Sequence, residues 1–151
     1  MTSTPSSSLA RTTLIVADVD RTLAFYRVLG FSPVKEIGGP RNPDSALPLA
    51  ARATQWRLVI LTGSRPDSGR LALLSFADEA PPVTVPAHDR VGIGDFVFVI
   101  EVDDADATHA ALVAGGARVV GPPIGYEMKR PDGSIGRGAI FHVWDPDGRL
   151  I

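Results

Sequence analysis

Residues 16–34, VADVDRTLAFYRVLGFSPV, decide the fold, because residues 102–120, VDDADATHAALVAGGARVV, repeat their pattern 86 positions later. Seven of the nineteen aligned positions are identical. The identical pairs are Val16/Val102, Asp18/Asp104, Asp20/Asp106, Thr22/Thr108, Ala24/Ala110, Gly30/Gly116 and Val34/Val120. Self-similarity at a fixed spacing indicates that one structural unit occurs twice in the chain.

Each copy predicts a strand, a helix and a further strand. Asp18 and Asp104 stand where an N-cap precedes a helix, and Gly30 and Gly116 stand where a helix ends. Apolar residues recur at helical spacing between these signals, more strongly in the first copy than in the second. They are Leu23, Tyr26 and Leu29, and then Ala107, Ala111 and Leu112.

Further apolar runs outside the repeat predict more strands. The strands expected before and after the helices are 12–16, 31–37, 56–61 and 70–76 in the first half, and 96–102, 118–120, 138–144 and 149 onward in the second. Two turns also match, since Pro66 to Leu71 reads PDSGRL and Pro146 to Leu150 reads PDGRL. The expected fold is α+β, with two β-α-β-β-β modules.

The 151 residues fit one domain with a core of its own. We expect residues 1–9 to form a disordered tail and residues 10–151 to form the domain. Module one covers about 10–80, a linker about 81–94 and module two about 95–151. Residues 38–49 are expected to form a long loop.

Composition excludes several classes of protein. The formal charge of −2 with scattered signs gives no basis for nucleic acid or anionic membrane binding. The absence of cysteine excludes disulfides, thiolate metal sites and a cysteine nucleophile. The polar start, MTSTPSSS, and the lack of a run of about 18 apolar residues predict a cytoplasmic protein without a signal peptide or membrane span.

Three segments resemble the vicinal oxygen chelate superfamily, which includes glyoxalases, bleomycin-resistance proteins and extradiol dioxygenases. They are Leu14 to Tyr26 with the following Leu-Gly-Phe at 29–31, Val102 to Asp104 with Gly-Gly-Ala at 115–117, and Asp145 to Ile151. The resemblance extends from about Arg11 to the end of the sequence. It implies paired β-α-β-β-β modules whose mixed sheets curl around a cavity. In metal-dependent members it also implies His, Glu or Gln ligands on the first and last strands of each module.

The positions implied for these ligands carry other residues. They fall at Arg11, at Val97 and near Ala72 or Leu73, none of which binds a divalent metal at neutral pH. The fourth position would follow Ile151, so its carboxylate is absent if the sequence is complete and present only in a longer chain. We therefore expect no metal or other cofactor. The alternative is a metal site with relocated ligands, which would be Glu101, Glu127 and His142.

Five residues are candidates for ligand binding. Arg11 is expected to pair with an anionic group of a ligand, in place of the metal, or to be an ordinary surface residue. Trp56 and Trp144 are expected to supply flat apolar walls, or to belong to the core. Glu101 shares strand parity with Val97, and His142 lies in an apolar strand, where histidine is most often a packed residue. His88 and His109 are expected to be solvent-exposed.

Two functions remain. The first is a metal-independent small-molecule binding protein of the glyoxalase/bleomycin-resistance type, which sequesters an aromatic or amphipathic ligand in its cavity as a homodimer. The alternative is a glyoxalase-like lyase or isomerase, or a dioxygenase. It would be metal-independent, with Glu101 or His142 as a general base, or would use relocated metal ligands.

Overall fold

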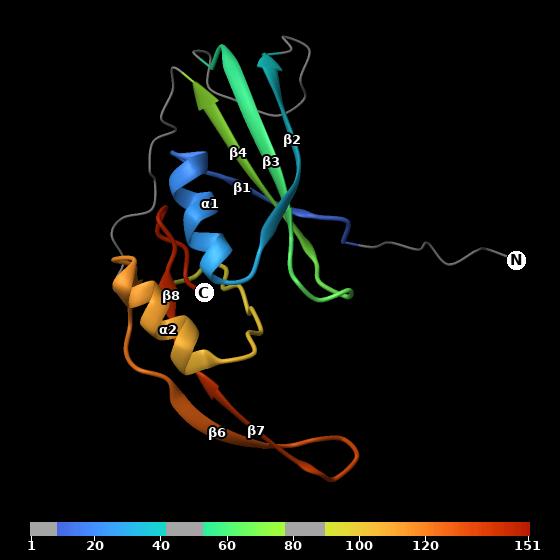
Figure 1. Cartoon of the computed structure of the whole chain (residues 1–151), viewed down its shortest axis with the longest axis vertical. Helices are drawn as coiled ribbons and strands as arrows, with labels where there is room; N and C mark the ends of the chain where they lie inside the picture. The colour runs from blue at the N-terminus through green and yellow to red at the C-terminus, as the bar shows by residue number, and fades with distance from the viewer. Residues whose placement is uncertain (1–8, 42–52, 78–89) are drawn as a thin grey trace, which may run out of the picture. The chain divides into compact units, whose positions relative to one another are not determined.

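The computed structural model describes residues 9–41, 53–77 and 90–151. The first eight residues of the predicted tail, residues 42–49 of the predicted loop and residues 81–89 of the predicted linker lie outside the described residues. The elements, in chain order, are β1 (Thr12–Ile15), α1 (Val19–Val28), β2 (Ser32–Pro40), β3 (Gln55–Thr62), β4 (Arg70–Ala77), α2 (Ala105–Ala114), β5 (Arg118–Val119), β6 (Ile124–Lys129), β7 (Ile135–Ile140) and β8 (Val143–Trp144) (Figure 1). Neither of the helices in the described residues is long and apolar enough to cross a membrane.

The helices begin and end at the predicted signals. The Asp104 carboxylate accepts a hydrogen bond of 2.8 Å from the Ala107 amide and so caps α2. Gly30 and Gly116, which follow the two helices, have φ angles of 86° and 75°. Glycine adopts this left-handed conformation without steric cost, and it reverses the chain after each helix.

The chain divides into two compact units. The first comprises Met1–Val19 and Phe31–Pro81, and the second comprises Asp20–Gly30 and Pro82–Ile151. Helix α1 therefore belongs, apart from Val19, with the second unit, although it follows β1 in sequence.

The first unit contains a four-stranded sheet in the order β1-β4-β3-β2 (Figure 1). Strand β1 runs parallel to β4, and the other pairs are antiparallel. The predicted strand 31–37 continues through Gly38 to Pro40, because β2 stays paired with β3 up to Gln55. The loop expected at residues 38–49 therefore begins only after Pro40.

The second unit repeats this order with shorter ladders. Val97 pairs in parallel with Leu150, Leu150 pairs antiparallel with Trp144, and β8 pairs with β5. In the first unit Thr12 pairs with Leu71, and Leu71 and Leu150 are the equivalent leucines of the two matching turns. The α+β class with two curled β-α-β-β-β modules is thus confirmed.

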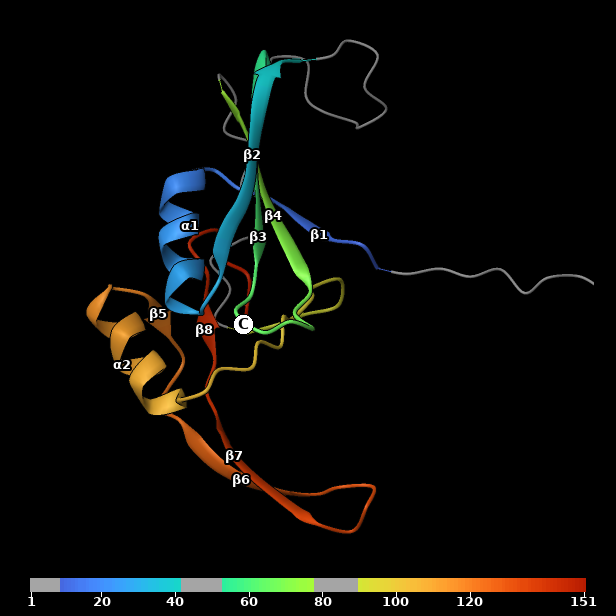
Figure 2. The same ribbon diagram turned by 45° about the vertical axis from the view of Figure 1, so that its right-hand side comes forward.

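The expected strand 96–102 is largely absent. Val97 forms a single bridge, and the Phe98 amide donates to the Leu150 carbonyl at 3.2 Å. A strand needs a partner at successive residues, and among the described residues only Leu150 pairs with this segment. Strands β6 and β7 extend from the rest of the unit as a two-stranded ribbon (Figure 2).

Candidate functional site

The sheet of the first unit has two faces of different composition. Side chains alternate between faces along a strand, and paired residues on neighbouring strands share a face. The face that we call the core face holds Leu14, Val59, Leu61, Leu71 and Leu73, each at most 7% exposed. The opposite face, which we call the open face, carries the candidate site.

The open face changes from polar to aromatic along the strands. Residues that pair across the strands in the order β1, β4, β3 and β2 form four rows on this face. The first row is Arg11, Arg70, Thr62 and Ser32, and the second is Thr13, Ala72, Ile60 and Lys35. The third row is Ile15, Leu74, Leu58 and Ile37, and the last is Phe76, Trp56 and Gly39. Arg11 directly precedes β1 and joins the first row because it continues the alternation of that strand. The result is one amphipathic surface with its charge at one end.

Trp56 is held in place at the aromatic end. Its indole Nε1 donates a hydrogen bond of 3.1 Å to the Pro40 carbonyl. Phe76 lies opposite it on β4, and Gly39 lies opposite it on β2. A Cβ atom added to Gly39 would meet no atom within 4 Å. Strand β2 therefore leaves open space beside the indole, where a flat apolar group can bury area against the ring.

Arg11 and Trp56 share the open face but lie at its opposite ends. Thr62, in the row of Arg11, and Trp56 are six positions apart in β3. At the rise of a strand this corresponds to about 20 Å. A compact planar ligand at Trp56 would not reach Arg11, whereas an elongated ligand would.

The residues at the positions implied for metal ligands do not fit a metal ion. Arg11 is an exposed guanidinium, Ala72 is fully buried, and Val97 pairs with Leu150. None of these side chains has a lone pair to donate. Throughout residues 9–41, 53–77 and 90–151, no group of three or more His, Asp or Glu side chains is placed to hold a metal ion. The alternative prediction, that Glu101, Glu127 and His142 come together as a metal site, is therefore wrong.

The remaining candidates lie in the second unit. Glu101 and His142 are exposed, whereas Trp144 is only 8% exposed. The Arg118 guanidinium lies 4.5 Å from the centroid of the Trp144 ring and covers it. His109, expected in solvent, is half-buried with its ring centroid 5.3 Å from that of Phe141, because α2 turns this side of the helix toward the chain after β7.

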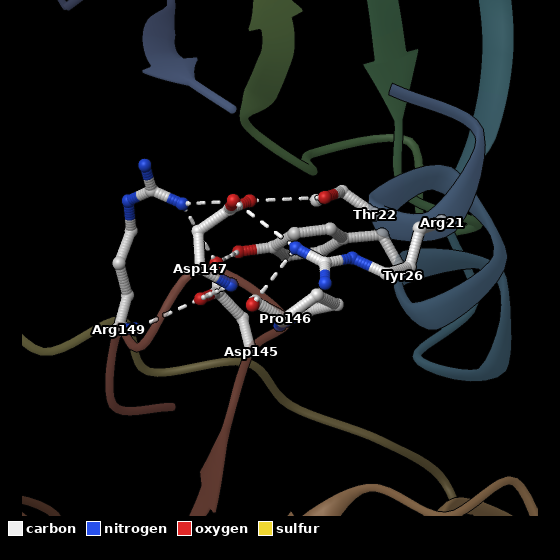
Figure 3. A network of polar contacts seen from close by, with 7 residues as sticks. All are labelled: Arg21, Thr22, Tyr26, Asp145, Pro146, Asp147 and Arg149. Carbon is white, nitrogen blue, oxygen red and sulfur yellow. Dashed lines mark hydrogen bonds and ion pairs between the residues drawn. The ribbon is translucent and has the colours of Figure 1, made fainter. Parts of the chain in front are cut away.

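A polar network in the second unit joins α1 to the last turn (Figure 3). The buried Asp145 carboxylate accepts hydrogen bonds from the Asp147 and Arg149 amides, from the Arg149 guanidinium and from the Tyr26 hydroxyl. Thr22 Oγ1 donates to Asp147 at 3.0 Å. Four donors thus satisfy the hydrogen-bonding capacity of this buried carboxylate. This network fixes the position of α1 and is structural.

Tyr26 does not serve as a base in this network. Burial raises the pKa of its hydroxyl far above the usual range, and the neighbouring charge of Asp145 raises it further. The hydroxyl therefore stays protonated and acts as a hydrogen bond donor.

Sequence reasoning missed most residues of the open face, and three of them are central to the site. Arg70, Gly39 and Phe76 become part of the face through the pairing of β4 with β1 and of β3 with β2 and β4. The matching turns PDSGRL and PDGRL were a signal for Arg70, because they indicate where β4 begins. No comparable sequence signal existed for Gly39.

Comparisons with known proteins agree with this architecture. The family model of the Glyoxalase/Bleomycin resistance protein/Dioxygenase superfamily matches residues 8–151. A glyoxalase family protein from Bacillus cereus is 18% identical with a TM-score of 0.70, over 100% of this chain and 95% of that chain. A fosfomycin resistance protein from Listeria monocytogenes, in complex with Mn(II) and sulfate, is 16% identical with a TM-score of 0.53, over 97% and 89% of the two chains.

A lactoylglutathione lyase from Agrobacterium tumefaciens is 25% identical with a TM-score of 0.44, over 97% of this chain and 92% of that chain. No curated protein sequence matches significantly. The Bacillus and Listeria structures show a shared fold.

Proposed function

Since the chain belongs to the glyoxalase/bleomycin resistance protein/dioxygenase superfamily, we propose that it is a metal-independent binding protein. Its ligand is a small aromatic or amphipathic molecule that the protein sequesters on the open face. The observation that carries this proposal is the partly exposed apolar surface around Trp56, on a sheet whose implied metal positions hold Arg11 and Ala72. In such a protein binding alone is the function, and no reaction is needed.

The apolar rows of the open face support binding by burial of area. Ile15 and Ile37 are 41% and 39% exposed, and Trp56 and Phe76 are half-buried. Covering such side chains gains about 25 cal/mol for each Å² of apolar area removed from water. The fixed indole loses little side-chain entropy when a ligand binds, because its hydrogen bond to Pro40 already restrains it.

Fluorescence titration with N-phenylnaphthylamine, a neutral aromatic probe, tests the proposal. We expect saturable binding to the wild-type protein and a loss of at least about tenfold in affinity for Trp56→Leu. Val34→Ala is the control, because Val34 is an exposed apolar residue at the bulge of β2 outside the four rows. Equal affinity of wild type and Trp56→Leu would contradict the proposed face.

Metal content provides the second test. Untagged protein purified without chelator is expected to contain far less than one nickel, zinc, iron or manganese ion per chain. Stoichiometric metal together with turnover of a glyoxalase or dioxygenase substrate would favour the enzymatic alternative instead. Glu101, His142 and Trp144 stay predictions as ligand-binding residues.

We also propose that the protein acts as a homodimer in the cytoplasm. One face of the β6–β7 ribbon carries Ile124, Tyr126, Met128 and Ile140, exposed by 46% to 68%. A two-stranded ribbon with such a face needs a covering layer, and a second copy would supply one. Light scattering is expected to give a dimer for the wild-type protein and a monomer for Met128→Glu. A monomeric wild type would contradict this assembly.

A further inference from the structure

The polar end of the open face has an unusual arrangement of charge. Thr12 pairs with Leu71 in the parallel ladder of β1 and β4, so the preceding residues Arg11 and Arg70 lie side by side at the same level. Neighbouring strands are about 4.8 Å apart. Like charges placed directly beside each other on a sheet are destabilising.

Other arginines of this chain have carboxylate partners. Arg57 pairs with Glu36 at 2.7 Å, Arg137 with Glu127 at 2.7 Å and Arg149 with Asp145 at 3.0 Å. In the part of the chain that the structure describes, no ion pair reaches Arg11 or Arg70. The two guanidinium groups thus form a concentration of positive charge that an anion would neutralise.

The neighbouring side chains suit an anion. Thr62 pairs directly with Arg70, and Ser32 pairs with Thr62, so two hydroxyl groups continue the row of the two arginines. Lys35 adds a third cation in the next row. Guanidinium groups bind carboxylate, sulfate and phosphate in a bidentate manner, and hydroxyl groups donate to the same oxygens.

We infer that Arg11 and Arg70 form an anion subsite and that the ligand is an elongated amphiphile. Its anionic group lies between the two guanidinium groups, and its apolar body extends across Ile60 and Leu74 to Trp56 and Phe76. The span of about 20 Å between the first and the last row sets the length of a ligand that uses both ends. This inference rests on the proposed function and deepens it by naming the class of ligand.

Two probes that differ in one charge test the inference. Dansylaminoundecanoate carries an aromatic group at one end of a long alkyl chain and a carboxylate at the other, and its methyl ester lacks the charge. We expect the acid to bind the wild-type protein about tenfold more tightly than the ester. Raising the salt concentration is expected to weaken binding of the acid and not of the ester.

Substitutions test whether Arg11 and Arg70 cause the tighter binding of the acid. Arg70→Gln is expected to lower the affinity for the acid to that for the ester, without changing the affinity for the ester. Arg27→Gln, which removes an exposed arginine from the last turn of α1, is the control and should leave both affinities unchanged. Because Arg11 and Arg70 share one anion, the losses for Arg11→Gln and Arg70→Gln should be less than additive.

Thermal unfolding without ligand separates binding from folding. If the two arginines repel each other, Arg70→Gln should unfold at the same or a higher temperature than the wild type while binding the acid less tightly. Equal affinities of the wild type for acid and ester, or an equal loss for Arg27→Gln, would overturn the subsite and leave the proposed function standing. Failure of both probes to bind would overturn both.

Discussion

The Tyr26 hydroxyl donates a hydrogen bond of 3.3 Å to the Asp145 carboxylate, across 119 positions of sequence. Tyr26 is fully buried, and Asp145 is 4% exposed. Tyr26→Phe keeps the ring and its edge-to-face contact with Phe25 but removes one donor from a buried carboxylate. We expect the free energy of unfolding to fall by about 1–3 kcal/mol, as measured by urea denaturation.

Tyr126→Phe is the matched control for this prediction. Tyr126 is 46% exposed on β6, so loss of its hydroxyl leaves no buried group without a partner, and the change should stay within about 0.5 kcal/mol. Equal stability of the two variants would show that Tyr26 does not support Asp145.

The buried Tyr26 hydroxyl also predicts how stability depends on alkaline pH. Burial and the Asp145 charge raise its pKa in the folded protein, while a tyrosine in the unfolded chain loses its proton near pH 10. Deprotonation therefore favours the unfolded chain, and the stabilising contribution is present below pH 10 and lost above it. Between pH 9 and 11 the wild type should lose more stability than Tyr26→Phe.

Absorbance of tyrosinate checks the same point in the folded protein. The chain contains two tyrosines, so the Tyr126→Phe variant isolates the signal of Tyr26, which should appear only as the protein unfolds. Parallel stability curves for the wild type and Tyr26→Phe, or tyrosinate absorbance from Tyr26 in the folded protein, would contradict the prediction.

The repeated pattern of residues 16–34 and 102–120 predicted local structure well, because caps and helix stops are local signals. Asp104 caps α2 and Gly116 follows its end, as expected. The similar turn sequences PDSGRL and PDGRL correctly indicated that equivalent strand segments follow them. The sequence also indicated which face of β1 Arg11 shares, because side chains alternate along a strand. It did not indicate that Arg70 lies beside Arg11, because this adjacency depends on the parallel pairing of β1 with β4.

Long-range packing explains the differences at His109 and in the segment 96–102. Helical periodicity did not show that Phe141 lies against His109, because these residues meet only in the folded chain. An apolar run such as Phe96 to Val102 favours a strand, but a ladder also requires a partner along its length. The grouping of α1 with the second unit likewise depends on Thr22 and Tyr26 meeting the last turn.

Two adjacent glycines of β2 give the sharpest test of the open face. Gly38 and Gly39 point to opposite faces, because they are successive residues of one strand. A Cβ atom on Gly38 would approach the Trp56 carbonyl oxygen to 2.7 Å, whereas a Cβ atom on Gly39 would meet nothing within 4 Å. Gly39→Val should therefore fold normally and gain up to about 1 kcal/mol from strand propensity.

The same Gly39→Val variant should bind N-phenylnaphthylamine at least about tenfold more weakly, because the valine fills the space beside the Trp56 indole that the ligand would use. Gly38→Val should instead lower the free energy of unfolding, since a backbone carbonyl cannot move aside without disturbing the pairing of β2 with β3. Urea denaturation and fluorescence titration of both variants measure the two effects separately. Normal probe binding by a folded Gly39→Val would place the ligand elsewhere.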